Sequence, residues 1–381
     1  MKRILFFTTH YFPGFLSGGI AQTVFNTAEW LGNDFEFFIV TQDRDLQSDK
    51  PYNKIKYGRW VKLGNSHVRY LSPIELSFSS LRKLINEIDH DILHLNSFFD
   101  IIFTLKILIL LRFNLINSRK IILSPRGEFV YGPLHIKYFK KKIFIFLLKF
   151  LGFYNKIVWH ASTTHEALGI VDQIGVSINE IKLAIDLPIR NPDLPKTTKA
   201  TSKTLQIAFI SRITREKNLD GAIRILKQVK SNVSFDIIGP HEDPVYWDEC
   251  KELIKELPKN ISIRILGIMN PRDKFKYFSS YDLLLFPTHG ENYGHVIAES
   301  ISAGTRVLIS QSTPWRNLAA DGIGWDLDKN NRNAFVCIIE MLAQQPLEDR
   351  LAIRSKVCEA AKVRLSAPKA FIQNRNLYLK E

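Results

Sequence analysis

Residues 281–300, YDLLLFPTHGENYGHVIAES, combine three signals of an open α/β sheet. The short apolar run LLLF is typical of a strand that is buried on both faces of a parallel sheet. A loop with Gly290 and Gly294 follows it, and a helical pattern begins near Tyr293 or Gly294. This order predicts one unit of a doubly wound fold, in which ligands bind beyond the carboxyl ends of the strands.

The same rhythm recurs on both sides of this stretch. Strand candidates that end in small or polar residues lie at 3–9, 35–42, 90–97, 120–127, 156–163, 205–212, 233–240, 261–267, 281–288 and 305–310. Helical patterns fill the gaps, for example GGIAQTVFNTAEWL at 18–31. The alternation predicts an α/β fold of two Rossmann-like, doubly wound parallel-sheet domains that face each other across a cleft.

The expected domain boundaries follow from composition. Residues 191–203, NPDLPKTTKATSK, are polar and lack periodicity, which indicates a linker. We therefore expect an N-terminal Rossmann-like domain at 1–190 and a C-terminal Rossmann-like domain at 204–362. A final helix within 363–381 is expected to return to the N-terminal domain. A length of 381 residues favours two domains over one.

Several classes of protein are disfavoured by composition. The three cysteines, Cys250, Cys337 and Cys358, are widely spaced, which argues against a disulfide framework or a zinc site and fits a reducing compartment. The most apolar stretch, 101–113, is interrupted by a lysine and an arginine, so we expect no transmembrane helix. The first residues show no signal-peptide pattern.

The positive charge is concentrated in one segment. Residues 101–156 hold eleven Lys/Arg and one acid, Glu128, which gives +10 of the total +14. Within this basic segment, KYFKKKIFIFLLKFLGFYNK at 137–156 mixes lysines with Phe, Ile and Leu. A basic, apolar surface helix suits an anionic membrane, whereas the alternative is a core helix with solvated lysines. No nucleic-acid module accompanies the charge, which disfavours a nucleic-acid partner. Because the basic segment suits an anionic membrane, we expect a cytoplasmic protein that binds peripherally to the inner face of the cell membrane.

Cationic and glycine residues follow the first strand of each half. Arg212 and Lys217 lie around a turn ahead of a helix led by Asp220. A guanidinium, an ammonium and helix N–H groups are what a diphosphate needs, although a solvated basic turn is the plain alternative. Gly18 and Gly19 precede the first helix and allow a ligand close to the backbone, but they do not form the GxGxxG fingerprint.

Two acids, Glu291 and Glu299, lie eight residues apart at the loop and in the helix that follows it. Carboxylates in these places can accept hydrogen bonds from ligand hydroxyls while helix N–H groups hold phosphate, a combination that suits a sugar nucleotide. The alternative is a capping acid at Glu291 and a solvated one at Glu299. His295 falls one turn from Glu299, and its role stays open.

Together these motifs resemble the retaining glycosyltransferases of family four, which have the GT-B fold. The mark of that family is Glu, seven residues, Glu, then a helix end of small residues and a strand, here Glu291, Glu299, Ala303-Gly304 and RVLIS. The resemblance extends over most of the chain through the Gly-Gly loop, SPRGE at 124–128, WHASTTHEA at 159–167, and TPWRNL with GIGW within 313–325.

The resemblance implies that domain 1–190 is the acceptor side and that domain 204–362 binds the nucleotide sugar. It also implies roles for these residues. Arg212 and Lys217 would hold the donor diphosphate and stabilise the leaving nucleotide. Glu299 would accept from the ribose hydroxyls and Glu291 would contact the transferred sugar. Further donor contacts would come from Gly18, Gly19, Gly239, Gly267, Ile268, Asn292, Tyr293 and Gly294.

One position departs from many relatives, which place a histidine near the reacting carbon. This chain has Arg126 there, as does a subset of relatives that build bacterial polysaccharides. Arg126 stays protonated and cannot be a general base, so its expected role is to bind a donor or acceptor oxygen. Asn96 and Glu128 are the other expected acceptor contacts.

The implied reaction moves a sugar from a UDP- or GDP-sugar to a hydroxyl of a glycan or lipid-linked glycan, in cell-surface polysaccharide or lipopolysaccharide synthesis. Cationic side chains would replace a metal, so we expect no metal requirement and no further cofactor. Rival interpretations are an epimerase of the same fold and a non-catalytic, membrane-associated glycan-binding protein. A paired-carboxylate hydrolase is disfavoured, because one acid lies in a loop and the other deep on a helix.

Overall fold

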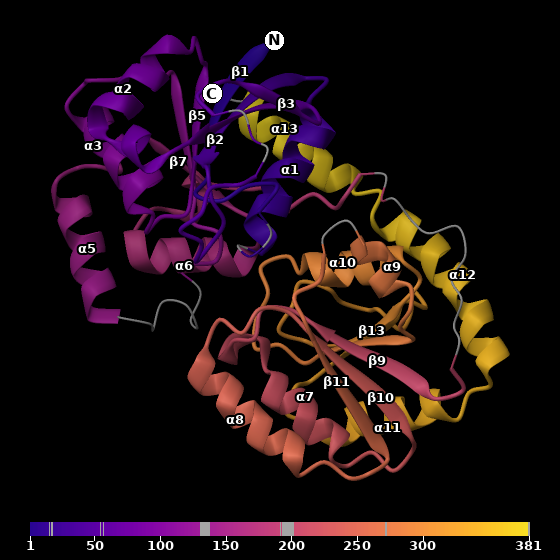
Figure 1. Cartoon of the computed structure of the whole chain (residues 1–381). Coiled ribbons are helices and arrows are strands. Elements are labelled where there is room, and N and C mark those ends of the chain that lie inside the picture. The colour runs from indigo at the N-terminus through magenta and orange to yellow at the C-terminus, as the bar shows by residue number, and fades with distance from the viewer. Residues whose placement is uncertain are drawn as a thin grey trace. The chain divides into compact units, whose positions relative to one another are not determined.

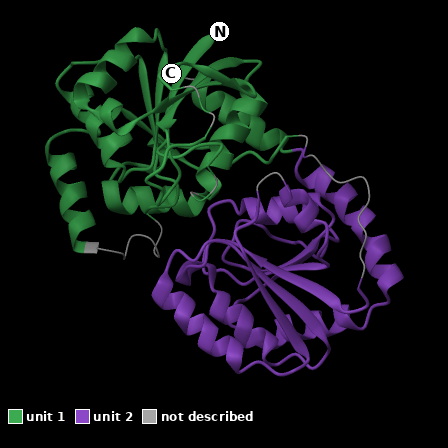
Figure 2. Ribbon diagram, viewed as in Figure 1, with its two compact units in different colours: residues 1–190, 367–381 green, residues 191–366 purple. Residues whose placement is uncertain are grey.

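The computed structural model describes residues 1–14, 16, 18–53, 55, 57–129, 138–190, 192, 202–270 and 273–379. The chain divides into two compact units, with Met1–Arg190 and Ala367–Glu381 in unit 1 and Asn191–Ser366 in unit 2 (Figure 2). The second boundary follows Ser366 rather than residue 362, because the helix before it continues through Arg364. The expected linker, 191–203, lies almost entirely outside the described residues.

The described residues of unit 1 form an eight-stranded sheet in the order β3-β4-β2-β1-β5-β6-β7-β8, parallel except for β3. Its strands are β1 (Lys2–Phe7), β2 (Phe35–Gln42), β3 (Val61–Leu63), β4 (Ser66–Leu71), β5 (Ile92–Asn96), β6 (Lys120–Ser124), β7 (Ile157–Ala161) and β8 (Ile181–Leu183). The sequence pattern missed β3, β4 and β8. They lie toward the edges of the sheet, and their polar residues interrupt any apolar run.

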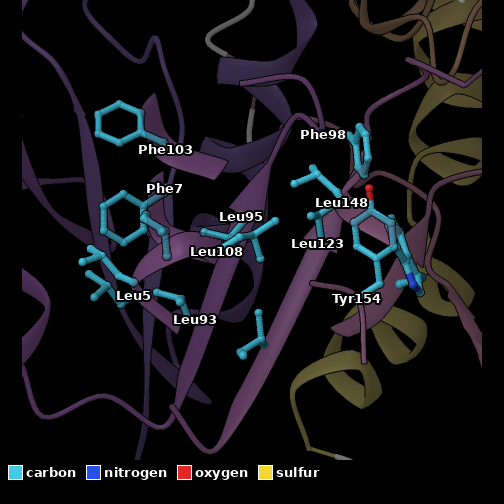
Figure 3. Packing of buried hydrophobic residues seen from close by; sticks show 14 of the residues in the cluster. Leu5, Phe7, Leu93, Leu95, Phe98, Phe103, Leu108, Leu123, Leu148 and Tyr154 are labelled. Carbon is cyan, nitrogen blue, oxygen red and sulfur yellow. The ribbon is translucent and has the colours of Figure 1, made fainter. Parts of the chain in front are cut away.

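Alternate residues of the central strands enter two hydrophobic cores, one on each face of the sheet. Leu5 and Phe7 belong to the first core (Figure 3), and Ile4 and Phe6 belong to the second. The first core is covered by α2 (Phe78–Glu87), α3 (Lys106–Arg112), α5 (Tyr138–Phe150) and α6 (Thr164–Ile174), and the second by α1 (Gly19–Leu31) and α13 (Pro368–Leu379). The short turns η1 (Pro73–Leu76), η2 (Ile101–Leu105) and η3 (Ile178–Glu180) join these elements.

The last helix, α13, packs beside α1 in unit 1 (Figure 1) and is anchored by a buried polar network. Hydrogen bonds join Tyr378 Oη to His94 Nδ1 at 3.0 Å, His94 Nε2 to Ser124 Oγ at 2.7 Å, and Ser124 Oγ to His160 Nδ1 at 2.6 Å. Burial lowers the pKa of His94 well below its ordinary value and that of His160 to about 4. The network therefore consists of neutral groups at neutral pH.

The described residues of unit 2 form a six-stranded parallel sheet in the order β11-β10-β9-β12-β13-β14. Its strands are β9 (Leu205–Ile210), β10 (Val233–Ile238), β11 (Ile261–Gly267), β12 (Leu283–Phe286), β13 (Arg306–Ser310) and β14 (Gly324–Leu327). Its helices are η4 (Arg215–Lys217), α7 (Leu219–Leu226), α8 (Pro244–Lys255), α9 (Lys274–Phe278), α10 (His295–Ser302), α11 (Arg332–Ala343) and α12 (Leu347–Arg364). α7 packs with α8 and α11, and α10 packs with α9 and α12, on opposite faces of the sheet (Figure 1).

The strand order reverses at β9, because β10 lies on one side of it and β12 on the other. The connections that leave two such strands run to opposite faces and open a crevice at the carboxyl edge of the sheet. Loop 211–218 follows β9 and loop 287–294 follows β12. The fold therefore brings together the two segments that carry the expected donor-binding residues.

Candidate active site

Loop 287–294 is held in place by its neighbours. Three hydrogen bonds fix it: His289 N–H to Glu216 O at 2.8 Å, Glu291 N–H to Ser312 O at 3.2 Å, and Trp315 Nε1 to Tyr293 O at 2.6 Å. Gly294 is the N-cap of α10 with a φ of 82°, and a Cβ there would lie 2.9 Å from Ile297 Cδ1. The helix thus begins at His295, just after the predicted start, because only glycine adopts this backbone without strain.

Lys217 and Glu291 form an ion pair across the switch point between β9 and β12. Lys217 Nζ lies 2.6 Å from Glu291 Oε1, and the two side chains are 12% and 13% exposed. Lys217 ends η4, whereas Glu291 lies in the loop after β12. The structure therefore joins two residues that the sequence separates by more than 70 positions.

Glu299, one turn inside α10, has its own cationic partner. Lys274 Nζ lies 2.6 Å from Glu299 Oε1, and both side chains are mostly buried. Lys274 opens α9, which packs against α10. No sequence pattern identifies Lys274, because a single lysine at the start of a short helix carries no motif. His295 is the first residue of α10, and its ring centroid lies 4.8 Å from that of Tyr293.

Arg212 follows β9 and is the third cation of this edge. Its Nη1 lies 2.6 Å from Glu242 Oε2, and both side chains are about one-third exposed. The two loops approach closely because Gly239, with a φ of 144°, would place a Cβ 1.7 Å from Ser211 O. Gly239 therefore has a packing reason for being glycine, independent of any ligand.

The residues at the carboxyl end of β11 have free space around them. Gly267 has a φ of 67°, and a Cβ added to it would meet no described atom within 4 Å. Ile268, the next residue, is half exposed. An apolar side chain beside an open glycine is compatible with the base contact that the resemblance implies. Asn292, the remaining predicted donor contact, lies in loop 287–294 next to Glu291.

In unit 1, Gly18 is the N-cap of α1 and has a φ of 73°. Gly19 is the first residue of the helix. A glycine with positive φ followed by free helix N–H groups is the local geometry that lets an anion approach the backbone. Phe15 and Ser17, which complete this loop, lie outside the described residues.

Arg126 points into unit 1 and is held by protein groups. Its Nη1 lies 2.9 Å from Asp186 Oδ1, and its Nε donates to Asn96 Oδ1 at 2.8 Å. The Arg126 and Asp186 side chains are almost fully buried. Asn96 donates in turn to Phe7 O at 3.0 Å. Asp186 was not among the predicted residues, because nothing near it in the sequence resembles a motif.

Glu128 binds the loop that follows β5. It accepts hydrogen bonds from Ser97 Oγ at 2.6 Å, from Phe98 N–H at 2.5 Å and from Phe99 N–H at 3.2 Å. Burial raises the pKa of Glu128 to about 7, although these three donors favour its charged form. Asn96, Arg126 and Glu128 therefore all act at the carboxyl ends of β5 and β6, where they order the loops.

The described residues contain no group of three or more His, Cys, Asp or Glu placed to hold a metal ion. Acidic residues of the stretches 43–45 and 326–328 have protein partners: Asp43 pairs with Arg44, and Asp326 in β14 accepts from Leu318 N–H. Within the same part of the chain, every helix is too short or too polar to cross a bilayer.

Solved structures of low sequence identity share this fold. An Anabaena protein, Alr3699/HepE, described in complex with UDP-glucose, is 15% identical, with a TM-score of 0.67 over 99% of both chains. Among curated proteins, an uncharacterized 41.2 kDa protein in the cps region of Klebsiella pneumoniae is 24% identical over 320 residues, 81% of this chain and 82% of that one. The Staphylococcus aureus capsular polysaccharide biosynthesis glycosyltransferase CapM is 24% identical over 151 residues, 39% of each chain.

The two parallel-sheet α/β units and their structural neighbours define a protein of the GT-B glycosyltransferase fold, which confirms the predicted fold class. Residues 191–358 match the family model described as glycosyl transferases group 1. The matched part of the chain contains Arg212, Lys217, Glu291 and Glu299, so these four residues lie in a region similar to the group 1 glycosyl transferases.

Proposed function

We propose that the protein is a retaining glycosyltransferase that uses a nucleoside-diphosphate sugar to extend a glycan or lipid-linked glycan of the cell surface. The observation that carries this proposal is the Lys217–Glu291 contact at the β9–β12 switch point. A cation for phosphate and a carboxylate for a sugar hydroxyl stand side by side, as phosphate and sugar do in such a donor. The capsule-related relatives support a polysaccharide or lipopolysaccharide acceptor.

In this proposal the donor replaces protein groups as the partner of several side chains. Lys217 and Arg212 turn to the diphosphate, Glu291 accepts from a hydroxyl of the sugar, and Glu299 accepts from the ribose. The N–H groups of residues 292–294 border the phosphate, and Gly239, Gly267 and Ile268 border the nucleoside. In unit 1, Gly18 and Gly19 give the start of α1 the backbone geometry that phosphate binding needs.

The proposed chemistry breaks the bond between the anomeric carbon and the diphosphate oxygen. The nucleoside diphosphate leaves with the bonding electrons, and the acceptor oxygen bonds to the same face of the sugar while its hydroxyl proton is released. Negative charge develops on the leaving phosphate, where Arg212 and Lys217 stabilise it. These cations take the place of a metal, so we expect activity to persist in a chelator.

On the acceptor side, Arg126, Asn96 and Glu128 shape the loops that end β5 and β6. The proposal includes an anionic membrane at the cytoplasmic face as the partner of the basic segment 101–156, since a membrane would present a lipid-linked acceptor. The structure narrows the surface available for this contact. Ile107, Leu108 and Leu110 of α3 are buried in the first core, so α3 cannot offer an apolar face.

The first experiment is a thermal-shift screen with UDP, GDP, ADP and their sugars. A ligand present at about one hundred times its Kd stabilises the folded protein by roughly 2.7 kcal/mol, which raises Tm by several degrees. Glu299→Ala should weaken the shift with free nucleotide, whereas Glu291→Ala should spare it and impair use of the sugar donor. Equal losses in both variants would contradict the assigned roles.

A second experiment follows donor and product by NMR. A transferase leaves the anomeric configuration of the donor in the product and needs an acceptor. Conversion of the donor sugar without acceptor would instead support an epimerase.

A further inference from the structure

Helix α5 has one buried face and one exposed apolar face. Ile145 and Leu148 belong to the first core. The opposite side exposes large apolar residues, namely Phe139 (80%), Ile143 (59%), Phe146 (66%), Leu147 (49%) and Phe150 (79%). At 3.6 residues per turn these five lie within about 100° of one another around the helix axis. We call them the α5 stripe.

Lysines border the α5 stripe on both sides. By the same helical spacing, Lys142 and Lys149 fall along one margin and Lys140 along the other. The sequence 138–156 contains no Asp or Glu. This arrangement differs from an ordinary solvated face, in which acids and bases alternate with few large apolar groups.

The turn after α3 extends this surface. Arg112 Nε donates to Leu151 O at 3.1 Å, which ties the end of α3 to the end of α5. The neighbouring Phe113 is 68% exposed, and Leu115 is partly exposed as well. The helices α3 and α5 are distant in sequence but lie near each other at one side of unit 1 (Figure 1). The residues at their ends therefore contribute to one exposed apolar and basic surface.

We propose that the α5 stripe inserts into the boundary between headgroups and acyl chains of an anionic membrane, while the flanking lysines bind lipid phosphates. This inference deepens the proposed function, on which it rests for the lipid-linked acceptor, and it replaces a general electrostatic contact by insertion of one helix. The charges favour lipid as the occupant. A second copy of α5 would set lysines against lysines, whereas lysine stems extend along apolar surface and leave their heads among phosphates.

The test compares binding of three proteins to vesicles of phosphatidylcholine with phosphatidylglycerol, by co-sedimentation at low and high salt. The natural protein should bind at low salt and keep a measurable fraction at high salt, because salt screens the lysines but not insertion. Substitution of Phe139, Phe146 and Phe150 by Ser should lower binding roughly tenfold or more at both salt concentrations. Substitution of Lys140, Lys142 and Lys149 by Gln should remove the salt-sensitive part alone.

A matched control changes exposed apolar residues of unit 1 that lie elsewhere, Ile74→Ser with Ile372→Ser. This control should bind vesicles like the natural protein. Depth is measured directly in Phe146→Trp, whose added fluorescence should be quenched by lipids brominated along the acyl chain. Unchanged binding of the triple Phe variant, or absence of quenching, would overturn the inference.

Two further readouts separate the possible failures. If the natural protein is a dimer in solution and the triple Phe variant is a monomer, the stripe is a protein interface and the inference is wrong. Nucleotide binding by thermal shift should be equal in all variants. Its absence throughout would count against the proposed function, whereas vesicle binding lost with nucleotide binding intact would count against insertion alone.

Discussion

Two ion pairs at the opposite ends of β12 have the same length and different surroundings. Arg350 Nη1–Asp282 Oδ2, beside the start of the strand, and Lys217 Nζ–Glu291 Oε1, beyond its end, both measure 2.6 Å. The Arg350 and Asp282 side chains are 1% and 3% exposed, and Arg350 also donates to Lys203 O. The first pair joins α12 to the sheet, whereas the second borders solvent at the carboxyl edge, so only the second can exchange its partners for a ligand.

The largest effect is expected from breaking the structural pair. Arg350→Leu removes the closer cationic partner of buried Asp282 and leaves it Arg354, whose Nη2 lies 3.6 Å from Asp282 Oδ1, so the free energy of unfolding should fall by about 3 kcal/mol. Urea denaturation of both proteins measures this. The matched control is Arg364→Leu on the same helix, whose pair with Asp321 is about one-third exposed and should contribute at most about 1 kcal/mol. Equal losses in both variants would remove the distinction between the two ends of β12.

Breaking the other pair should affect the reaction instead. Lys217→Met removes a cation from the developing phosphate charge, and kcat should fall by a factor on the order of 100 to 1000. Circular dichroism and Tm should show a folded protein. The control is Lys227→Met, whose pair with Glu256 is half exposed on the surface of the same unit, and which should keep full activity. A Lys217 variant that unfolds would show that this pair is structural too.

The Lys274–Glu299 pair tests whether such contacts act through positioning. Lys274→Met should raise the KM for the donor by about tenfold, because Glu299 loses the group that orients it, and should leave kcat nearly unchanged. Lys274→Arg should restore much of the affinity. A fall in kcat without any change in KM would instead place Lys274 beside the reacting atoms.

A smaller change in stability is expected from the neutral network of His94 and His160 in unit 1. His94 and His160 have a lowered pKa in the folded state, first through burial and next through the nearby Arg126. The unfolded chain therefore binds more protons below pH 6.5, and stability should decrease as the pH falls from about 6.5 to about 4, by up to about 1.4 kcal/mol per pH unit for each histidine. Urea midpoints measured across this range provide the check. A flat profile would mean that the histidines become protonated without loss of the fold.

The sequence predicted the parts of the structure that are encoded locally. Buried parallel strands such as β12 are continuous apolar runs, and the loop around Glu291 carries its own glycines. Edge strands such as β3 lack that signal, because an exposed position such as Lys62 holds a polar residue. Partners such as Lys274 and Asp186 are fixed by packing between distant segments, which no local pattern records.

Arg126 and the basic segment also show that a local sequence pattern does not record which residues become buried. The charge count included Arg126 and residues 106–112 in the basic segment expected to meet a membrane, yet Arg126 is buried against Asp186 and α3 packs into the first core. A count of charges does not say which side chains are buried, whereas a folded helix has one face that is buried and another that is exposed. Within the described part of the basic segment, α5 separates its apolar residues into a buried face and an exposed one.

The network around Tyr378 also determines when the second core of unit 1 can be completed during synthesis of the chain. A ribosome makes residues 1–190 first, then all of unit 2, and only afterwards the helix that brings Tyr378 to His94. Every segment of unit 2 is thus available while the second core of unit 1 still lacks Leu377 and Tyr378. Unit 1 is therefore synthesised first but completes its second core last. Nascent chains arrested before residue 367 should expose that core to chaperones and proteases.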